Sequence, residues 1–270
     1  MTGAFPEWAL SPLETCSTRL RDIGRVLRAS VAGLSALIEF RKCLPRLLSP
    51  TQKRELEDIL SPIGQSIENI VKAAERPIVD ARRDVRLLTS SAVVSLWSAL
   101  EVGIEDFLIA WMMNQPGALN VPVLRKTKIT LAEYDALDRE ERIRVLLSEL
   151  ERSVVGKQGV DCFEPLLNTF GLSGPVDRRV KAAIYEMQHV RNVVVHRGGR
   201  ADRRFVKTCP DWDAKVGQPL EVKWKQCGDY QRAAGEYVLT VAERVAARLG
   251  VTASPELDRL RSSLHKAITR

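Results

Sequence analysis

Apolar residues that recur every three or four positions run through the first part of the chain. This spacing places them on one face of a helix. The first such stripe comprises Leu20, Ile23, Leu27, Val31, Leu34 and Ile38. The second comprises Leu56, Ile59, Ile63, Ile67 and Ile70. Leu44-Pro45 should end the first helix, Ser49-Pro50 should begin the second, and Arg76-Pro77 should close it. We therefore expect residues 1–78 to form a helical hairpin, an extension suited to binding a partner or a second copy.

Two further helices are predicted in the middle of the chain. The first carries the stripe Val93, Trp97, Leu100, Ile104, Phe107 and Trp111. It should stop at Gln115-Pro116-Gly117. Asp138 and Glu141 have the spacing of a capping box, which marks a helix start. The helix behind it carries Ile143, Leu146, Leu147, Leu150 and Val154.

The last third of the chain predicts three more helices and one short β element. Asp177 should cap a helix whose apolar stripe is Val180, Ile184, Met187 and Val194, and Gly198-Gly199 should stop it. Residues 203–208 and 220–224 are β-branched or aromatic runs between turn residues, which predicts a β-hairpin. Asp229 should cap the next helix, and Ser254-Pro255 should start the final one. The predicted fold is mainly α: a helical bundle over residues 79–250 with a small β-hairpin insertion, the N-terminal hairpin and a helical tail over 251–270.

The composition indicates a net positive charge and predicts neither a membrane segment nor a metal cluster. The chain has 41 Lys and Arg against 34 Asp and Glu, giving a net charge of +7. That balance favours a polyanionic partner such as nucleic acid, and equally describes a basic soluble protein without one. The longest apolar stretch, 92–113, is interrupted by acidic residues, and the start lacks the features of a signal peptide, so we expect a cytoplasmic protein. The five cysteines form no CxxC pair, which argues against zinc.

The stretch RNVVVHRGG, residues 191–199, holds the candidate chemistry. On an ideal helix Arg191 falls about 20° from Val180, in the middle of the apolar stripe. A buried arginine needs partners for its five donors. Either it pairs with a core carboxylate such as Glu101 or Glu105, or it faces a cleft that receives an anion.

Asn192 and His196 share a different face of the same helix. They lie roughly 100° or more from Arg191. Either the helix loosens before Gly198, or two copies of the helix meet and pool Arg191 and His196 in one site. The second option predicts a homodimer. A histidine that titrates near neutrality can move the proton of an RNA 2′-OH, and an arginine can stabilise a phosphorane. Such a site needs no metal or other cofactor.

Basic residues cluster directly after this motif. Arg197, Arg200, Arg203 and Arg204 have Asp202 as the only acid among them. A patch of this kind can hold the phosphate backbone of RNA.

The arrangement of these segments resembles the HEPN superfamily, in particular its RiboL-PSP type. The resemblance rests on Arg191-Asn192-Val193-Val194-Val195-His196 at a helix end before glycines. It also rests on the upstream helix SSAVVSLWSALEVGIEDFL, a short β element like RRFVKT…GQPLEVKW, and the closing helix DYQRAAGEYVLTVAERVAARL. It covers about residues 80–250. Many members of this family are metal-independent endoribonucleases of toxin–antitoxin and phage-defence systems that dimerise around two such motifs.

The resemblance implies catalytic roles for Arg191 and His196, with Asn192 in support. It also implies RNA as substrate and, as partners, a second copy and an antitoxin or defence-system protein. His189 is not part of the signature and is expected to be exposed or structural. Two alternatives stay open: a non-catalytic helical module that binds RNA or a protein, and, less favoured, a DNA-binding regulator.

Overall fold

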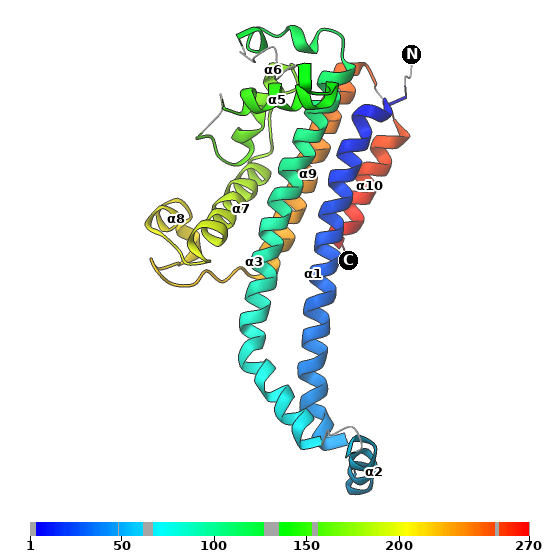
Figure 1. The fold of residues 1–270 in the computed structure, drawn as a ribbon, viewed down its shortest axis with the longest axis vertical. Coiled ribbons are helices and arrows are strands. Elements are labelled where there is room, and N and C mark those ends of the chain that lie inside the picture. Colours follow the sequence, from blue (N-terminus) through cyan, green and yellow to red (C-terminus); the bar gives the residue numbers. More distant parts are fainter. Residues whose placement is uncertain are drawn as a thin grey trace.

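The computed structural model describes residues 4–47, 49–61, 67–126, 135–152, 156–251 and 254–269. Its long helices are α1 (Glu7–Leu47), α3 (Ile67–Asn114), α9 (Trp224–Leu249) and α10 (Pro255–Thr269), which run side by side along the molecule (Figure 1). The remaining α-helices are α2 (Pro50–Leu60), α5 (Arg139–Arg152), α6 (Glu164–Thr169), α7 (Arg178–Arg197) and α8 (Arg203–Thr208). The described ranges contain no β-strand. The prediction of a mainly α helical bundle is confirmed.

The N-terminal helix belongs to the core of this bundle. α1 packs against α3, α9 and α10. Its apolar face, including Leu13 and Leu20, is buried in the same cluster as Trp97 of α3 and Tyr237 of α9. The backbones approach closely here, since a Cβ on Gly103 of α3 would lie 2.4 Å from the Cys16 Sγ of α1. Residues from both sides of position 78 therefore pack into one core. The domain boundary at residue 78 stays a prediction.

The two predicted breaks around the hairpin differ from the structure. α1 continues to Leu47, two residues past Pro45, and α3 runs unbroken from Ile67 through Pro77. A proline inside a helix removes one hydrogen bond and clashes with the preceding turn. α3 nevertheless continues through Pro77, and along its length it packs on α1, a tertiary contact that local propensity does not reveal. Ile63 and Val154 of the predicted stripes lie outside the described residues.

The predicted β-hairpin is wrong. Residues 203–208 form α8, and 220–223 lead into α9 without pairing as a strand. The Asp202 carboxylate accepts a hydrogen bond from the Phe205 N–H at 2.8 Å, which caps α8. Phe205 is buried, so the segment gains its core contact as a helical turn. What remains of β structure is one isolated antiparallel bridge between Arg200 and Pro219.

Most predicted helix caps are confirmed. Asp138 and Glu141 exchange two hydrogen bonds of 2.8 Å between side chain and backbone, as a capping box requires. α2 and α10 begin at Pro50 and Pro255, as predicted. Asp229 is the exception. It lies inside α9, which begins at Trp224 with Lys223 at the N-cap.

Within the described part of the chain, one helical stretch is long and apolar enough to cross a membrane by composition. It spans Val85–Asn114 of α3, and half of its most apolar window is buried inside the bundle. Trp97, Trp111 and Met112 on this stretch are buried, as expected for core residues. This stretch is therefore the central helix of the bundle.

Candidate active site

The candidate site lies at the C-terminal end of α7. Asp177 caps the start of this helix by accepting hydrogen bonds from the N–H groups of Arg179 and Val180. Gly198 ends it with φ at 57°, in the left-handed conformation that glycine adopts without strain. The apolar face of α7 packs against α3 and α9. Both ends therefore match the prediction, and they fix the motif at an exposed helix end.

Arg191, Asn192 and His196 meet within one chain. One terminal nitrogen of Arg191, Nη1, lies 3.2 Å from Asn192 Oδ1 and 3.2 Å from His196 Nε2. The expectation that one helix separates Arg191 from His196 is wrong, because it considered backbone angles and not the reach of the side chain. The three residues therefore need no second copy to come together, and the homodimer stays a prediction.

The hydrogen bond between these groups sets the roles of its two partners. A guanidinium carries donors only, so Arg191 donates and His196 Nε2 accepts. An imidazole nitrogen with a free electron pair can accept a proton as a general base.

The alternative partner for Arg191 is absent from this site. Among the described residues, no carboxylate lies within ion-pair distance of its guanidinium, and the buried Nε has no hydrogen-bond partner. Glu105 instead sits in an acidic cluster with Glu101 and Asp106 of α3 and Glu151 of α5. Burial, and then these carboxylates, raise the pKa of Glu105 to about 7. The predicted pairing of Arg191 with Glu101 or Glu105 does not occur.

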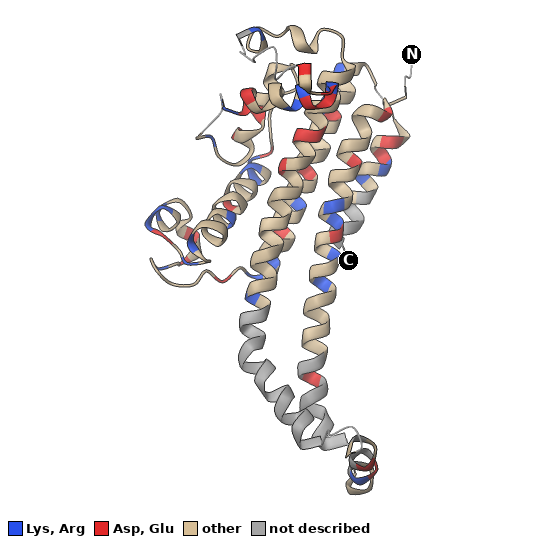
Figure 2. Ribbon diagram, viewed as in Figure 1, with Lys and Arg blue, Asp and Glu red and all other residues tan. Residues whose placement is uncertain are grey.

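The four basic residues after the motif divide into two pairs. Arg197 donates to the Asp202 carboxylate at 3.2 Å, and Arg200 donates to the Gly217 carbonyl at 3.1 Å. Arg203 and Arg204 are exposed in the first turn of α8. The pKa of Asp202 is lowered, first by the hydrogen bond from the Phe205 N–H and then by Arg197. One of the four charges is thus compensated locally, and several basic positions lie on α8 and the adjoining loop (Figure 2).

His189 has a structural role. It is buried, and its Nε2 donates to Gln158 Oε1 at 2.9 Å while its ring packs edge-on against Tyr185. Burial, and then Arg204, lower its pKa, so it is neutral at physiological pH. This geometry agrees with the expectation that His189 lies outside the candidate site. It also shows that the His189 ring is buried and not exposed.

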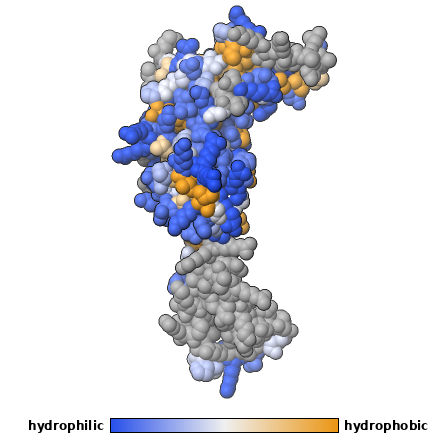
Figure 3. All heavy atoms as spheres, turned by 90° about the vertical axis from the view of Figure 1, so that its left-hand side faces the viewer, coloured by the Kyte–Doolittle hydropathy of each residue, from blue (hydrophilic) through white to orange (hydrophobic). Residues whose placement is uncertain are grey.

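A groove of about 420 Å³ lies beside the motif. It is lined by Arg86, Leu87 and Ser90 of α3, by the end of α7, and by the loop that returns to α9. The flank of the molecule that carries α7 and α8 exposes hydrophobic side chains in the middle of a hydrophilic surface (Figure 3). Leu87 and Val195 are 64% and 47% exposed. No sequence motif marks Arg86 or Leu87, so the groove emerges only from the packing of α3 against α7.

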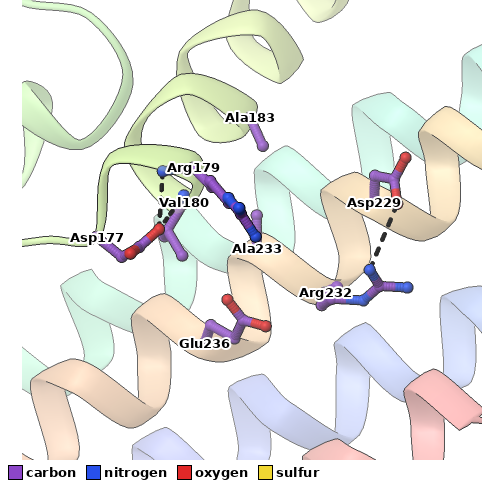
Figure 4. A pocket seen from close by; sticks show the side chains of 8 residues that line it. All are labelled: Asp177, Arg179, Val180, Ala183, Asp229, Arg232, Ala233 and Glu236. Carbon is purple, nitrogen blue, oxygen red and sulfur yellow. Dashed lines mark hydrogen bonds and ion pairs between the residues drawn. The ribbon is translucent and has the colours of Figure 1, made fainter.

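Another groove, of about 500 Å³, lies at the opposite end of α7 (Figure 4). Asp177 and Arg179 of α7 line it together with Asp229, Arg232 and Glu236 of α9. A helix start can bind an anion through its free N–H groups. Here the Asp177 carboxylate already accepts from two of them, and two further carboxylates face the space. This groove is therefore unsuited to phosphate.

Metal-binding groups do not gather in the described part of the chain, where no cluster of three His, Cys, Asp or Glu residues could hold an ion. Cys16, Cys209 and Cys227 are buried, and burial raises the pKa of each thiol to about 12. These thiols are protonated at neutral pH and are poor nucleophiles. No family model, curated protein or solved structure matches the chain, so the three residues at the end of α7 carry the functional argument by their geometry.

Proposed function

We propose that the protein is a metal-independent endoribonuclease of the HEPN type, a toxin or phage-defence effector that acts in the cytoplasm. The observation that supports this most directly is the contact between Arg191 and His196. A guanidinium hydrogen-bonded to an imidazole places a phosphate ligand next to a candidate general base at an exposed helix end. The sequence resemblance described above adds the reaction class.

The proposed reaction uses the 2′-OH of the substrate as the nucleophile. When the phosphate binds Arg191, the guanidinium turns from His196 to the phosphate oxygens and frees Nε2. His196 Nε2 then takes the 2′-OH proton, the 2′-oxygen bonds to the adjacent phosphorus, and the bond from phosphorus to the 5′-oxygen breaks. Arg191 stabilises the charge that develops on the phosphorane oxygens, and Asn192 orients the guanidinium. The products are a 2′,3′-cyclic phosphate and a 5′-hydroxyl.

A second copy of the chain has a defined task in this reaction. The attacking and leaving oxygens of an in-line displacement lie on opposite sides of the phosphorus. One imidazole therefore cannot face both oxygens. We propose that the chain forms a homodimer in which the second copy donates the proton to the 5′-oxygen.

The test is cleavage of total RNA in EDTA by purified wild-type protein and by Arg191→Ala and His196→Ala. Loss of the base or of the phosphorane ligand should slow cleavage by at least about 100-fold. Arg178→Ala, an exposed arginine at the other end of α7, is the control and should cut at the wild-type rate.

Full activity in either Ala variant, with folding verified by circular dichroism, would remove that residue from the mechanism. Wild-type protein that binds RNA without cutting it would favour the non-catalytic binding module instead.

A further inference from the structure

The groove between α3 and the end of α7 has a rigid floor. Gly199 accepts a hydrogen bond from the Leu220 N–H at 2.7 Å, and Gln218 accepts one from the Ala201 N–H at 2.9 Å. Together with the bridge between Arg200 and Pro219, these bonds tie the returning loop to the end of α7. The loop is fixed by backbone contacts, so the groove is a preformed feature of the bundle.

Two glycines keep the groove open. Gly198 and Gly199 both have positive φ, at 57° and 73°, and both line the groove. A Cβ added to either would meet no atom within 4 Å. The glycines therefore supply the backbone conformation that the turn requires, and the missing side chains leave space above it.

The lining of the groove combines cations with apolar surface. Arg86 and Arg200 contribute positive charge, and none of the lining residues is acidic. Leu87, Val194 and Leu220 contribute apolar walls, with Leu87 64% exposed. A volume of about 420 Å³ lies within the range of small-ligand sites. A nucleotide has the matching chemistry, because its phosphate pairs with arginine and its base has flat apolar faces.

The groove and the motif share the C-terminal end of α7. Val194 and His196 are two residues apart, so they project on nearly opposite sides of α7. Gly198 and Gly199 connect these two sides at the helix end. A strand whose scissile phosphate lies at Arg191 and His196 can thus pass over the glycines and enter the groove with a flanking nucleotide.

We propose that this groove binds a nucleotide of single-stranded RNA next to the cleaved position. Arg86 and Arg200 hold its phosphate, and Leu87 and Val194 contact its base. The proposal rests on the proposed ribonuclease function, and it adds residues of α3 that belong to no motif. A groove of about 420 Å³ has room for one unpaired nucleotide, so we expect single-stranded RNA to be the preferred substrate.

The test uses a fluorescein-labelled 2′-O-methyl RNA twelve-mer, which cannot be cleaved because its 2′-oxygens are blocked. Arg86→Glu and Leu87→Ser should each weaken its binding to the full-length protein by about tenfold. For Arg86→Glu, the salt dependence of binding should also fall by about 0.7 in the slope of log K against log salt. Arg178→Glu, a charge reversal at the far end of α7, should change the affinity less than twofold. As a second readout, a 4-thiouridine within the twelve-mer should crosslink to residues 86–90 or 198–220.

The outcomes separate this inference from the ribonuclease proposal. If the wild-type protein cuts RNA but both groove variants bind the twelve-mer as it does, the groove proposal is wrong and the nuclease proposal stands. Crosslinks confined to other segments would overturn it equally. If the wild-type protein neither cuts RNA nor binds the twelve-mer, both proposals fail.

Discussion

Arg191 shows how one long side chain alters a prediction based on backbone geometry. Its Cα belongs to the buried face of α7, yet Nη1 reaches Asn192 and His196 on the exposed face at 3.2 Å each. The Nε on the same guanidinium is buried and has no partner. Arg191 therefore uses part of its donor set to hold Asn192 and His196 at the site.

Glu105 yields a prediction about pH. Its pKa is raised to about 7 by burial and by Glu151, Glu101 and Asp106, against about 4.3 in an unfolded chain. As the pH rises between these values, the unfolded chain loses its proton first, so stability falls and the full penalty is present above pH 7. Glu105→Gln should therefore raise the free energy of unfolding at pH 8 and leave it nearly unchanged at pH 4.5. We expect about 1 kcal/mol, because solvent screens a half-buried group.

Urea unfolding followed by circular dichroism at both pH values measures this difference. Glu221→Gln, an exposed carboxylate with no resolved interaction, is the control and should show no such pH dependence. An equal effect of Glu105→Gln at pH 4.5 and 8 would show that Glu105 carries no raised pKa.

At the scale of the element, α7 depends on its two ends to place the site. Asp177 satisfies two N–H groups at its start, and Gly198 in the left-handed conformation returns its own N–H to the Val193 carbonyl. Between them, Val180, Ile184 and Met187 fix the rotation of the helix against α3 and α9. This rotation decides that Arg191 has one buried nitrogen and one at the surface.

The capping role of Asp177 predicts a specific pair of variants. Asp177→Ala should lower the free energy of unfolding by about 1 kcal/mol, because it leaves helix donors without a partner. Asp177→Asn keeps a carbonyl oxygen in place and should cost much less. Urea denaturation of both variants measures the difference, and equal losses in the two would show that the cap contributes nothing.

At the scale of the whole molecule, the long helices form one packed body. α1 packs on α3, α9 and α10, and α10 packs on α9, where Leu264 lies beside Gly235 (Figure 1). Two glycines allow α1 to lie close to its neighbours. A Cβ on Gly24 of α1 would lie 2.2 Å from Gln231 Oε1 of α9, and a Cβ on Gly103 of α3 would meet Cys16 of α1. The first helix thus supports the bundle that holds α7.

The close contact between α1 and α3 can be tested with a matched pair of glycines. Gly103→Ala should lower the free energy of unfolding by about 1–3 kcal/mol through overpacking against Cys16. Gly33→Ala, in α1 and with no atom within 4 Å of the added Cβ, should raise it by about 0.5–1 kcal/mol through helix propensity. Thermal or urea unfolding of both variants measures these changes in the free energy of unfolding. A neutral Gly103→Ala would argue that α1 does not pack on α3 as described.

Local patterns in the sequence predicted the helices, because apolar spacing and capping residues act within a few positions. The capping box at Asp138 and the stop at Gly198 are of this kind. The sequence-based predictions failed where contacts between residues far apart in the sequence determine the local structure. Phe205 gains its burial as part of α8 and not of a strand, and α3 passes Pro77 while packed on α1. The groove at Leu87 has no sequence signal, since α3 and α7 build it together.

The most direct test of the proposed chemistry is cleavage, in EDTA, of an RNA that carries a single 2′-deoxy nucleotide at the cleaved position. If His196 activates the 2′-OH, the protein cuts the all-RNA strand to a 2′,3′-cyclic phosphate and a 5′-hydroxyl, and leaves the substituted bond intact. Cleavage of the 2′-deoxy bond, or a requirement for added divalent metal, would contradict the mechanism.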